Sequence, residues 1–162
     1  MNNFSENTMS EQKQLKSDLT LHWVVAGIML CLLIAYNIVC YIFGAEIQIE
    51  IAEEQRVFIR TSLYIVAIIL FPLVNLLRYI LLRLNHTMPG DNSAKSRYFM
   101  TTVVTLALIE CIGLFGLVMF VLGDEVNSLY IFTVLGLLGL FLHRPKLQEY
   151  QQIIEALRQQ KS

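Results

Sequence analysis

The sequence predicts an all-α integral membrane protein with four transmembrane helices arranged as two hairpins. Of the 162 residues, 56% are hydrophobic and only 15% are charged, whereas soluble domains carry about 25% charged residues. The apolar residues gather into four long runs, and only two of the 12 basic residues lie at the first and third connections between these runs. This composition excludes an ordinary soluble globular domain.

The four apolar runs cover residues 21–43, 58–82, 99–122 and 126–142. About 20 residues, rising about 1.5 Å each, cross a hydrocarbon core about 30 Å thick. The first three runs reach this length, and the fourth is shorter. Because every backbone amide needs a partner within its own segment in hydrocarbon, we expect each run to be a helix.

The distribution of basic residues predicts the orientation of these helices. Ten of the 12 Lys and Arg residues lie before the first run, around the middle connection or after the fourth run. The other two are Arg56 and Arg60. Basic residues near helix ends are retained in the cytoplasm. We therefore expect both termini to be cytoplasmic, and we expect the membrane to be the inner (cytoplasmic) membrane of a bacterium.

The runs divide the chain into a polar N-terminal tail (1–20), a transmembrane domain (21–142) and a C-terminal tail (143–162). Residues 89–93 have the composition of a turn between the second and third helices. The short connection 123–125 forces the third and fourth helices to be antiparallel neighbours.

The C-terminal tail is predicted to form a short amphipathic helix. Its apolar residues fall on one helical stripe, which consists of Leu147, Tyr150, Ile154 and Leu157. Such a helix can lie on the lipid headgroups, cap the bundle or dock a soluble partner, and the sequence leaves these roles open.

Glu110 is the one acidic residue that falls inside an apolar run. At about 1.5 Å per residue it lies about 17 Å from the start of the run 99–122, close to the middle of a bilayer. An ionised acid at this depth costs about 2.5 to 3.5 kcal/mol, so the neutral acid is favoured. We therefore expect a carboxyl group that can bind and release a proton.

The segment 107–119 around this acid reads Ala-Leu-Ile-Glu-Cys-Ile-Gly-Leu-Phe-Gly-Leu-Val-Met. It resembles the ion-carrying helix of the rotary ATP synthase c subunit, whose pattern is Ala-Leu-x-Glu-x-x-Gly-(Leu/Ile)-(Phe/Tyr)-x-Leu. The resemblance covers residues 99–122 and does not extend to the rest of the chain. It implies that Glu110 is a reversibly protonated carboxylate.

The alternative is that Glu110 is a structural acid that joins helices by hydrogen bonds. Pro72 cannot donate to the carbonyl group of Ile68, which leaves an acceptor at a similar depth. Asn37 and Asn75 lie within about one turn of the midplane and are further candidate partners. Small residues suited to close packing of the third and fourth helices are Gly113, Gly116, Gly136 and Gly139.

No pattern in the sequence indicates catalysis. Nucleotide-binding, metalloprotease and Ser/His/Asp motifs are not found, and a net charge of −1 gives no electrostatic footprint for nucleic acid. His22, His86 and His143 lie at helix ends without metal-ligand spacing, which suggests interfacial anchoring. Trp23, Tyr41 and Tyr98 fall where aromatic belts form. We expect no enzymatic activity, cofactor or metal.

Two functions remain. The first is an accessory or interaction subunit, whose partners are the lipid bilayer and either further copies of the chain or a larger membrane complex. The second is a proton-binding component that resembles a c subunit, with Glu110 as the exchanging carboxylate.

Overall fold

The chain folds into five helices, and the described residues form no other regular element. This computed structural model describes the backbone of residues 2–87 and 93–161, with the side chains of 15, 17–44, 46–87 and 93–160. The helices are α1 (Asn2–Ile47), α2 (Glu53–Thr87), α3 (Ala94–Val121), α4 (Val126–Leu142) and α5 (Leu147–Lys161). The predicted all-helical class is therefore confirmed.

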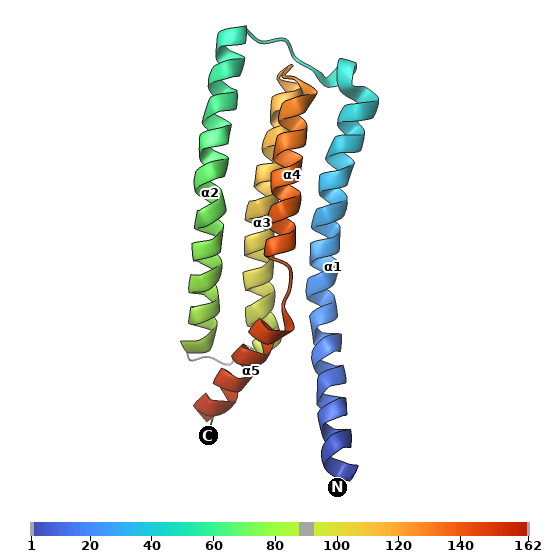
Figure 1. The fold of residues 1–162 in the computed structure, drawn as a ribbon, viewed down its shortest axis with the longest axis vertical. Coiled ribbons are helices and arrows are strands. Elements are labelled where there is room, and N and C mark those ends of the chain that lie inside the picture. The colour runs from blue at the N-terminus through green and yellow to red at the C-terminus, as the bar shows by residue number, and fades with distance from the viewer. Residues whose placement is uncertain (1, 88–92, 162) are drawn as a thin grey trace.

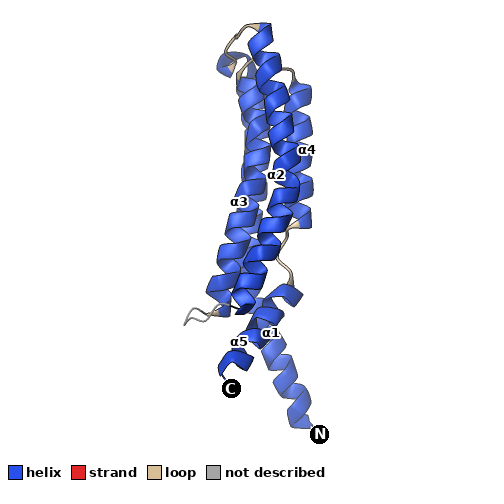
Figure 2. Ribbon diagram, turned by 90° about the vertical axis from the view of Figure 1, so that its left-hand side faces the viewer, coloured by secondary structure: helices blue, strands red, loops and turns tan. Residues whose placement is uncertain are grey.

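α3 is the central helix of the bundle. It packs against α1, α2 and α4, and α5 contacts α1, α2 and α3. Figure 1 shows α3 and α4 between α1 and α2, which form the two edges. Both termini lie at the same end (Figure 1), and Figure 2 shows α5 beyond the ends of α2, α3 and α4 and alongside α1, which continues past it. We call this end the terminal end and the other the far end.

Most of the helices extend beyond the predicted apolar runs. α1 begins at Asn2 rather than at residue 21, and α2 extends past 58–82 in both directions. The reason is that Glu, Gln, Lys and Met continue a helix well, so a helix need not end where its apolar run ends. α4 coincides with the run 126–142. The predicted turn at 89–93 lies outside the described residues except for Ser93, whose side chain caps α3.

Three helical segments are long and apolar enough to cross a membrane, namely Ser17–Gly44, Glu53–Thr87 and Ala94–Val121. α4 and α5 meet at a bend of 44° and pass the same test together, which raises the number of candidate spans to as many as four. Large apolar side chains also cover the outward faces of α1 and α2. These features are compatible with an integral membrane protein.

The far end is closed by contacts that the two connections there make with α2 and α3. The amide of Ile49 donates to the carbonyl of Val121 over 2.7 Å, and Arg60 forms a 3.0 Å ion pair with Asp124. Gly123 has a φ of 76°, a left-handed conformation that glycine adopts without steric cost. The predicted tight connection between α3 and α4 is confirmed.

The terminal end is capped by α5. Its buried residues Tyr150 and Ile153 pack against Leu19 of α1 and Tyr98 of α3, with the predicted stripe residues Leu147, Ile154 and Leu157 around them. Ile153 did not belong to the predicted stripe, yet it is fully buried. The sequence left three roles open for this helix, and in the structure it caps the bundle.

Candidate functional site

Glu110 is buried in the interior of the bundle. Only 6% of the residue is exposed. The Tyr36 hydroxyl of α1 is close enough to interact with the carboxyl group, yet neither carboxyl oxygen has a hydrogen-bond partner among the described residues. For an ionised carboxylate the Tyr36 hydroxyl is the nearby donor, and one neutral hydroxyl offsets little of the cost of burying a charge, so the environment favours the protonated acid.

α2 does not supply Glu110 with the partners that the sequence suggested. Ile68, Pro72 and Asn75 all lie on the exposed surface of α2, and the expected hydrogen bond from Glu110 to the Ile68 carbonyl is not formed. The buried residues of α2 are Ala67, Val74 and Arg78. Consecutive residues point about 100° apart on a helix, so burial of residue 67 turns residue 68 away from α3.

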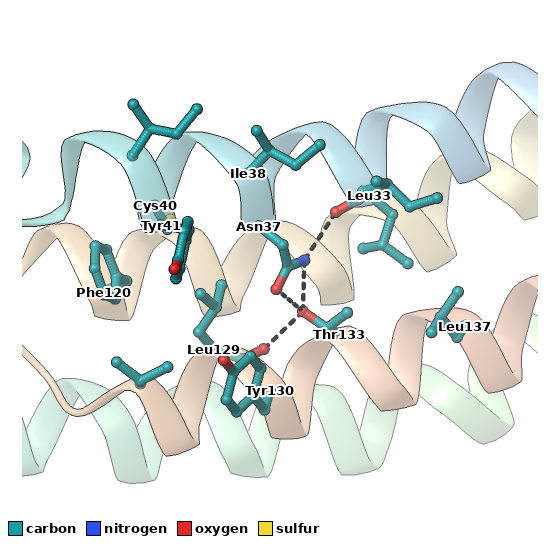
Figure 3. A pocket seen from close by; sticks show the side chains of 13 residues that line it. Leu33, Asn37, Ile38, Cys40, Tyr41, Phe120, Leu129, Tyr130, Thr133 and Leu137 are labelled. Atoms are coloured by element: carbon teal, nitrogen blue, oxygen red, sulfur yellow. Dashed lines mark hydrogen bonds between the residues drawn. The ribbon is translucent and has the colours of Figure 1, made fainter.

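Asn37 is also not a partner of Glu110, because it pairs with α4. Its amide nitrogen donates to the Thr133 hydroxyl over 3.0 Å and to the carbonyl of Leu33 over 2.9 Å. Figure 3 shows this pair bridging α1 and α4. Thr133 in turn donates to the carbonyl of Leu129 over 2.7 Å. The side-chain amide of Asn37 therefore joins α1 to α4, two helices that are distant in sequence.

The Asn37–Thr133 pair lies in a groove between α1 and α4, which we call the α1–α4 groove. Its cavity volume is about 650 Å³, and its walls include Ile34, Ile38, Tyr41, Phe120, Tyr130 and Leu137 (Figure 3). Apart from Asn37 and Thr133, the wall side chains are apolar or aromatic, with the thiol of Cys40 among them. The groove therefore suits an apolar occupant.

The predicted glycines lie where α3 and α4 meet. A Cβ atom on Gly116 would lie 3.0 Å from the Cβ of Phe132 and 3.1 Å from the carbonyl oxygen of Leu129. A Cβ atom on Gly139 would lie 2.6 Å from a side-chain carbon of Ile109. Gly136 lies against Gly113, and Leu33 of α1 fits against both. The predicted close approach of the two helices is therefore confirmed.

A polar layer beneath α5 was not predicted from the sequence. We call it the end layer; it consists of Arg78, Tyr98, Thr105, His143 and Glu149. Arg78 forms a 2.7 Å ion pair with Glu149 and donates over 2.9 Å to the carbonyl of His143. The Tyr98 hydroxyl lies 3.0 Å from the same carboxylate and accepts a 2.8 Å hydrogen bond from the amide of Lys146. The end layer thus fastens α5 to α2 and α3.

A signal for the end layer was present in the sequence. Arg78 was counted only as a basic residue near a helix end, yet it lies inside the predicted run 58–82. An ionisable residue inside an apolar run needs a partner, as was argued for Glu110. Tyr98 was assigned to the aromatic belt, and this assignment is wrong because the residue is fully buried.

His22 and His143 are buried rather than interfacial. Nδ1 of His143 donates to the carbonyl of Gly139 over 3.0 Å, and its Nε2 is buried without a partner among the described residues. Burial, together with the charges of Arg78 and Lys146, lowers the pKa of His143 below its usual 6.5. His143 is therefore held as the neutral imidazole.

No protein-family model, curated protein or solved structure matches this chain. Within the described residues, no group of three or more His, Cys, Asp or Glu side chains could hold a metal ion. Three features thus define the candidate site: a lone buried acid, an apolar groove and a polar layer that fixes α5.

Proposed function

We propose that this chain is a four-span protein of the inner (cytoplasmic) membrane of a bacterium, with both termini in the cytoplasm. Both termini and α5 lie at one end of the bundle (Figure 1), and ten of the 12 basic residues belong to segments at that end. α4 alone is the shortest of the four proposed spans, at 17 residues. It is about 25 Å long, which a slightly thinned bilayer accommodates.

Cysteine labelling tests this topology. In a background in which Cys31, Cys40 and Cys111 are replaced by alanine, Thr87→Cys and Asn127→Cys place single thiols at opposite ends of the bundle. A membrane-impermeant maleimide added to intact cells should label Asn127→Cys, and Thr87→Cys should be labelled only after the membrane is opened. Labelling of both from the same side contradicts the four-span topology.

Within the membrane, the chain acts as an accessory or interaction subunit that binds a transmembrane helix of a larger complex. The α1–α4 groove supports this role, because it is open on one side, lies within two candidate spans and is lined almost entirely by apolar side chains. Transmembrane helices associate by close packing and by interhelical hydrogen bonds. The half-buried Asn37–Thr133 pair offers a polar contact for a partner helix in the groove.

Photo-crosslinking from within the groove tests this role. A photoreactive residue at Ile38, in the groove wall, should form an adduct with one defined membrane protein in native membranes. The control is Leu32, which is exposed on the same helix but lies outside the groove. Leu137→Trp fills the groove and should remove the Ile38 adduct. Equal adducts from both positions, or adducts with lipid alone, contradict the proposal.

A second candidate function is reversible proton binding by Glu110. The observation that favours it is the buried carboxyl group without an ion-pair or hydrogen-bond partner among the described residues. A hydrophobic carbodiimide, which reacts with protonated acids, should label the protein at Glu110 and not label Glu110→Gln. Labelling should decline as the pH rises. An unlabelled wild-type protein, with Glu110→Gln fully functional, would leave the acid only a structural role.

A further inference from the structure

Asn75 is an unpaired amide on the outer surface of α2. It lies about 10 Å inside the end of the apolar run 58–82, at about 1.5 Å per residue, and therefore at hydrocarbon depth in the proposed topology. The residue is exposed, and no hydrogen bond to its side chain is found among the described residues. Asn37, the corresponding amide on α1, bonds both to its own helix and to α4.

Asn75 belongs to a regular stripe on the exposed surface of α2. The stripe, which we call the α2 seam, consists of Ile65, Ile68, Pro72, Asn75 and Tyr79. Its residues follow one another at alternating spacings of three and four, which is the repeat of helices that pack side by side at a small angle. All five side chains are exposed, with values of 53% for Ile65, 70% for Ile68 and 62% for Tyr79.

The carboxamide of Asn75 indicates which kind of molecule covers the α2 seam. Lipid chains can cover the apolar residues but cannot bond an amide, and an unbonded amide in an apolar medium costs several kcal/mol. A carboxamide has two donors and an acceptor, so it can bond an identical carboxamide across a two-fold axis. A single Asn within such a seam also fixes the register of the two helices.

We infer that the α2 seam is the interface of a parallel homodimer in the membrane, in which Asn75 bonds Asn75 of a second copy. α2 lies at one edge of the bundle (Figure 1), so a second copy can approach it without displacing α1 or α4. The α1–α4 groove stays open in this dimer. The inference rests on the proposed function in one respect, which is that α2 crosses the membrane.

Disulfide crosslinking in native membranes tests the seam. In the cysteine-free background, the seam variants Ile65→Cys, Ile68→Cys and Tyr79→Cys should form disulfide-linked dimers on oxidation with copper phenanthroline. The controls Val66→Cys, Leu73→Cys and Ile80→Cys are also exposed on α2 but lie off the seam, and they should remain monomeric. Equal crosslinking in both sets, or a disulfide to a different protein at the seam, overturns the inference.

A second measurement isolates the amide. The dissociation constant for self-association in detergent should rise about three- to tenfold in Asn75→Leu, which is about 0.6 to 1.4 kcal/mol, because interhelical hydrogen bonds in membranes have this strength. Asn75→Gln keeps the carboxamide and should lose less. Leu73→Ala, on the same helix outside the seam, should change nothing. An unchanged constant in Asn75→Leu overturns the inference.

The thiol-labelling experiment separates the two proposals. If Thr87→Cys and Asn127→Cys are labelled from opposite sides but the seam variants do not crosslink, the dimer is wrong and the membrane topology stands. If both thiols are labelled from the same side, the topology fails first and the seam loses its physical basis.

Discussion

The end layer beneath α5 and the interior of the bundle bury carboxyl groups in opposite ways. In the end layer, Glu149 receives an ion pair from Arg78 and lies within hydrogen-bond distance of the Tyr98 hydroxyl. In the interior, neither carboxyl oxygen of Glu110 has a hydrogen-bond partner among the described residues, and the polar group close to it is the Tyr36 hydroxyl. The first environment supplies partners for a charged carboxylate, whereas the second favours a neutral acid.

The difference shows how each region is stabilised. Arg78 holds the carboxylate charge in the end layer and also bonds the carbonyl of His143, so α5 is fixed by directional contacts. The interior is held by close packing, with α3 and α4 meeting through glycines. Removing one partner of a buried ion pair leaves an uncompensated charge, whereas closely packed helices lose stability when a methyl group is added.

The largest expected effect comes from breaking the ion pair of the end layer. Arg78→Met removes the buried cation and leaves the Glu149 carboxylate with the more distant Lys146 ammonium at 3.8 Å, which should cost about 3 kcal/mol of unfolding free energy. Thermal unfolding in detergent measures this loss. The double variant Arg78→Met with Glu149→Gln removes both charges and should be more stable than the single variant. If the two are equally destabilised, the pairing of the carboxylate does not stabilise this region.

A methyl group added to the interior should have the next largest effect. In Gly116→Ala, the new Cβ meets the backbone of Leu129 at 3.1 Å and the Cβ of Phe132 at 3.0 Å. α3 and α4 must therefore separate, at a cost of about 1 to 3 kcal/mol. Gly27→Ala is the matched control, since nothing lies within 4 Å of its added Cβ. Similar melting temperatures for the two variants would contradict close packing as the main contact between α3 and α4.

A smaller effect is expected from removing the proton of the interior acid. Glu110→Gln replaces a neutral acid by a neutral amide of the same size, so the unfolding free energy should change by less than about 1 kcal/mol. The wild-type infrared spectrum at pH 7 should contain a protonated carboxyl band that Glu110→Gln lacks. Glu125→Gln, at an exposed acid of the far end, should instead lose carboxylate absorption. A carboxylate band lost with Glu110 would show that the interior does hold a charge.

The smallest effect concerns His143 in the end layer. Its lowered pKa means that the unfolded chain binds the proton more readily than the folded protein does. The contribution of the neutral His143 to the unfolding free energy is therefore fully present above pH 6.5. It is lost as the pH falls below this value towards the folded-state pKa. As the pH is lowered through this range, the melting temperature should decline more steeply in the wild type than in His143→Gln. Parallel curves would mean that His143 is not held neutral.

The sequence by itself determined the class of the protein and the positions of its apolar helices. It placed α4 between the same residues as the structure, and the short connection together with the glycines was enough to predict that α3 and α4 are close neighbours. It also located Glu110 as the acid inside an apolar run. These features follow from local properties, which are the length of a run, the composition of a turn and the size of a side chain.

Only the tertiary structure decided which residues face one another. Asn37 was a candidate partner of Glu110, but its side chain bonds Thr133. Arg78 was used only to predict the orientation of the helices, but it forms an ion pair with Glu149. In a helix that is apolar on all sides, the spacing of residues fixes their relative directions and leaves the rotation of the helix about its axis undetermined. That rotation is set by contacts between segments far apart in the chain, and the face it turns outward on α2 leaves Asn75 exposed.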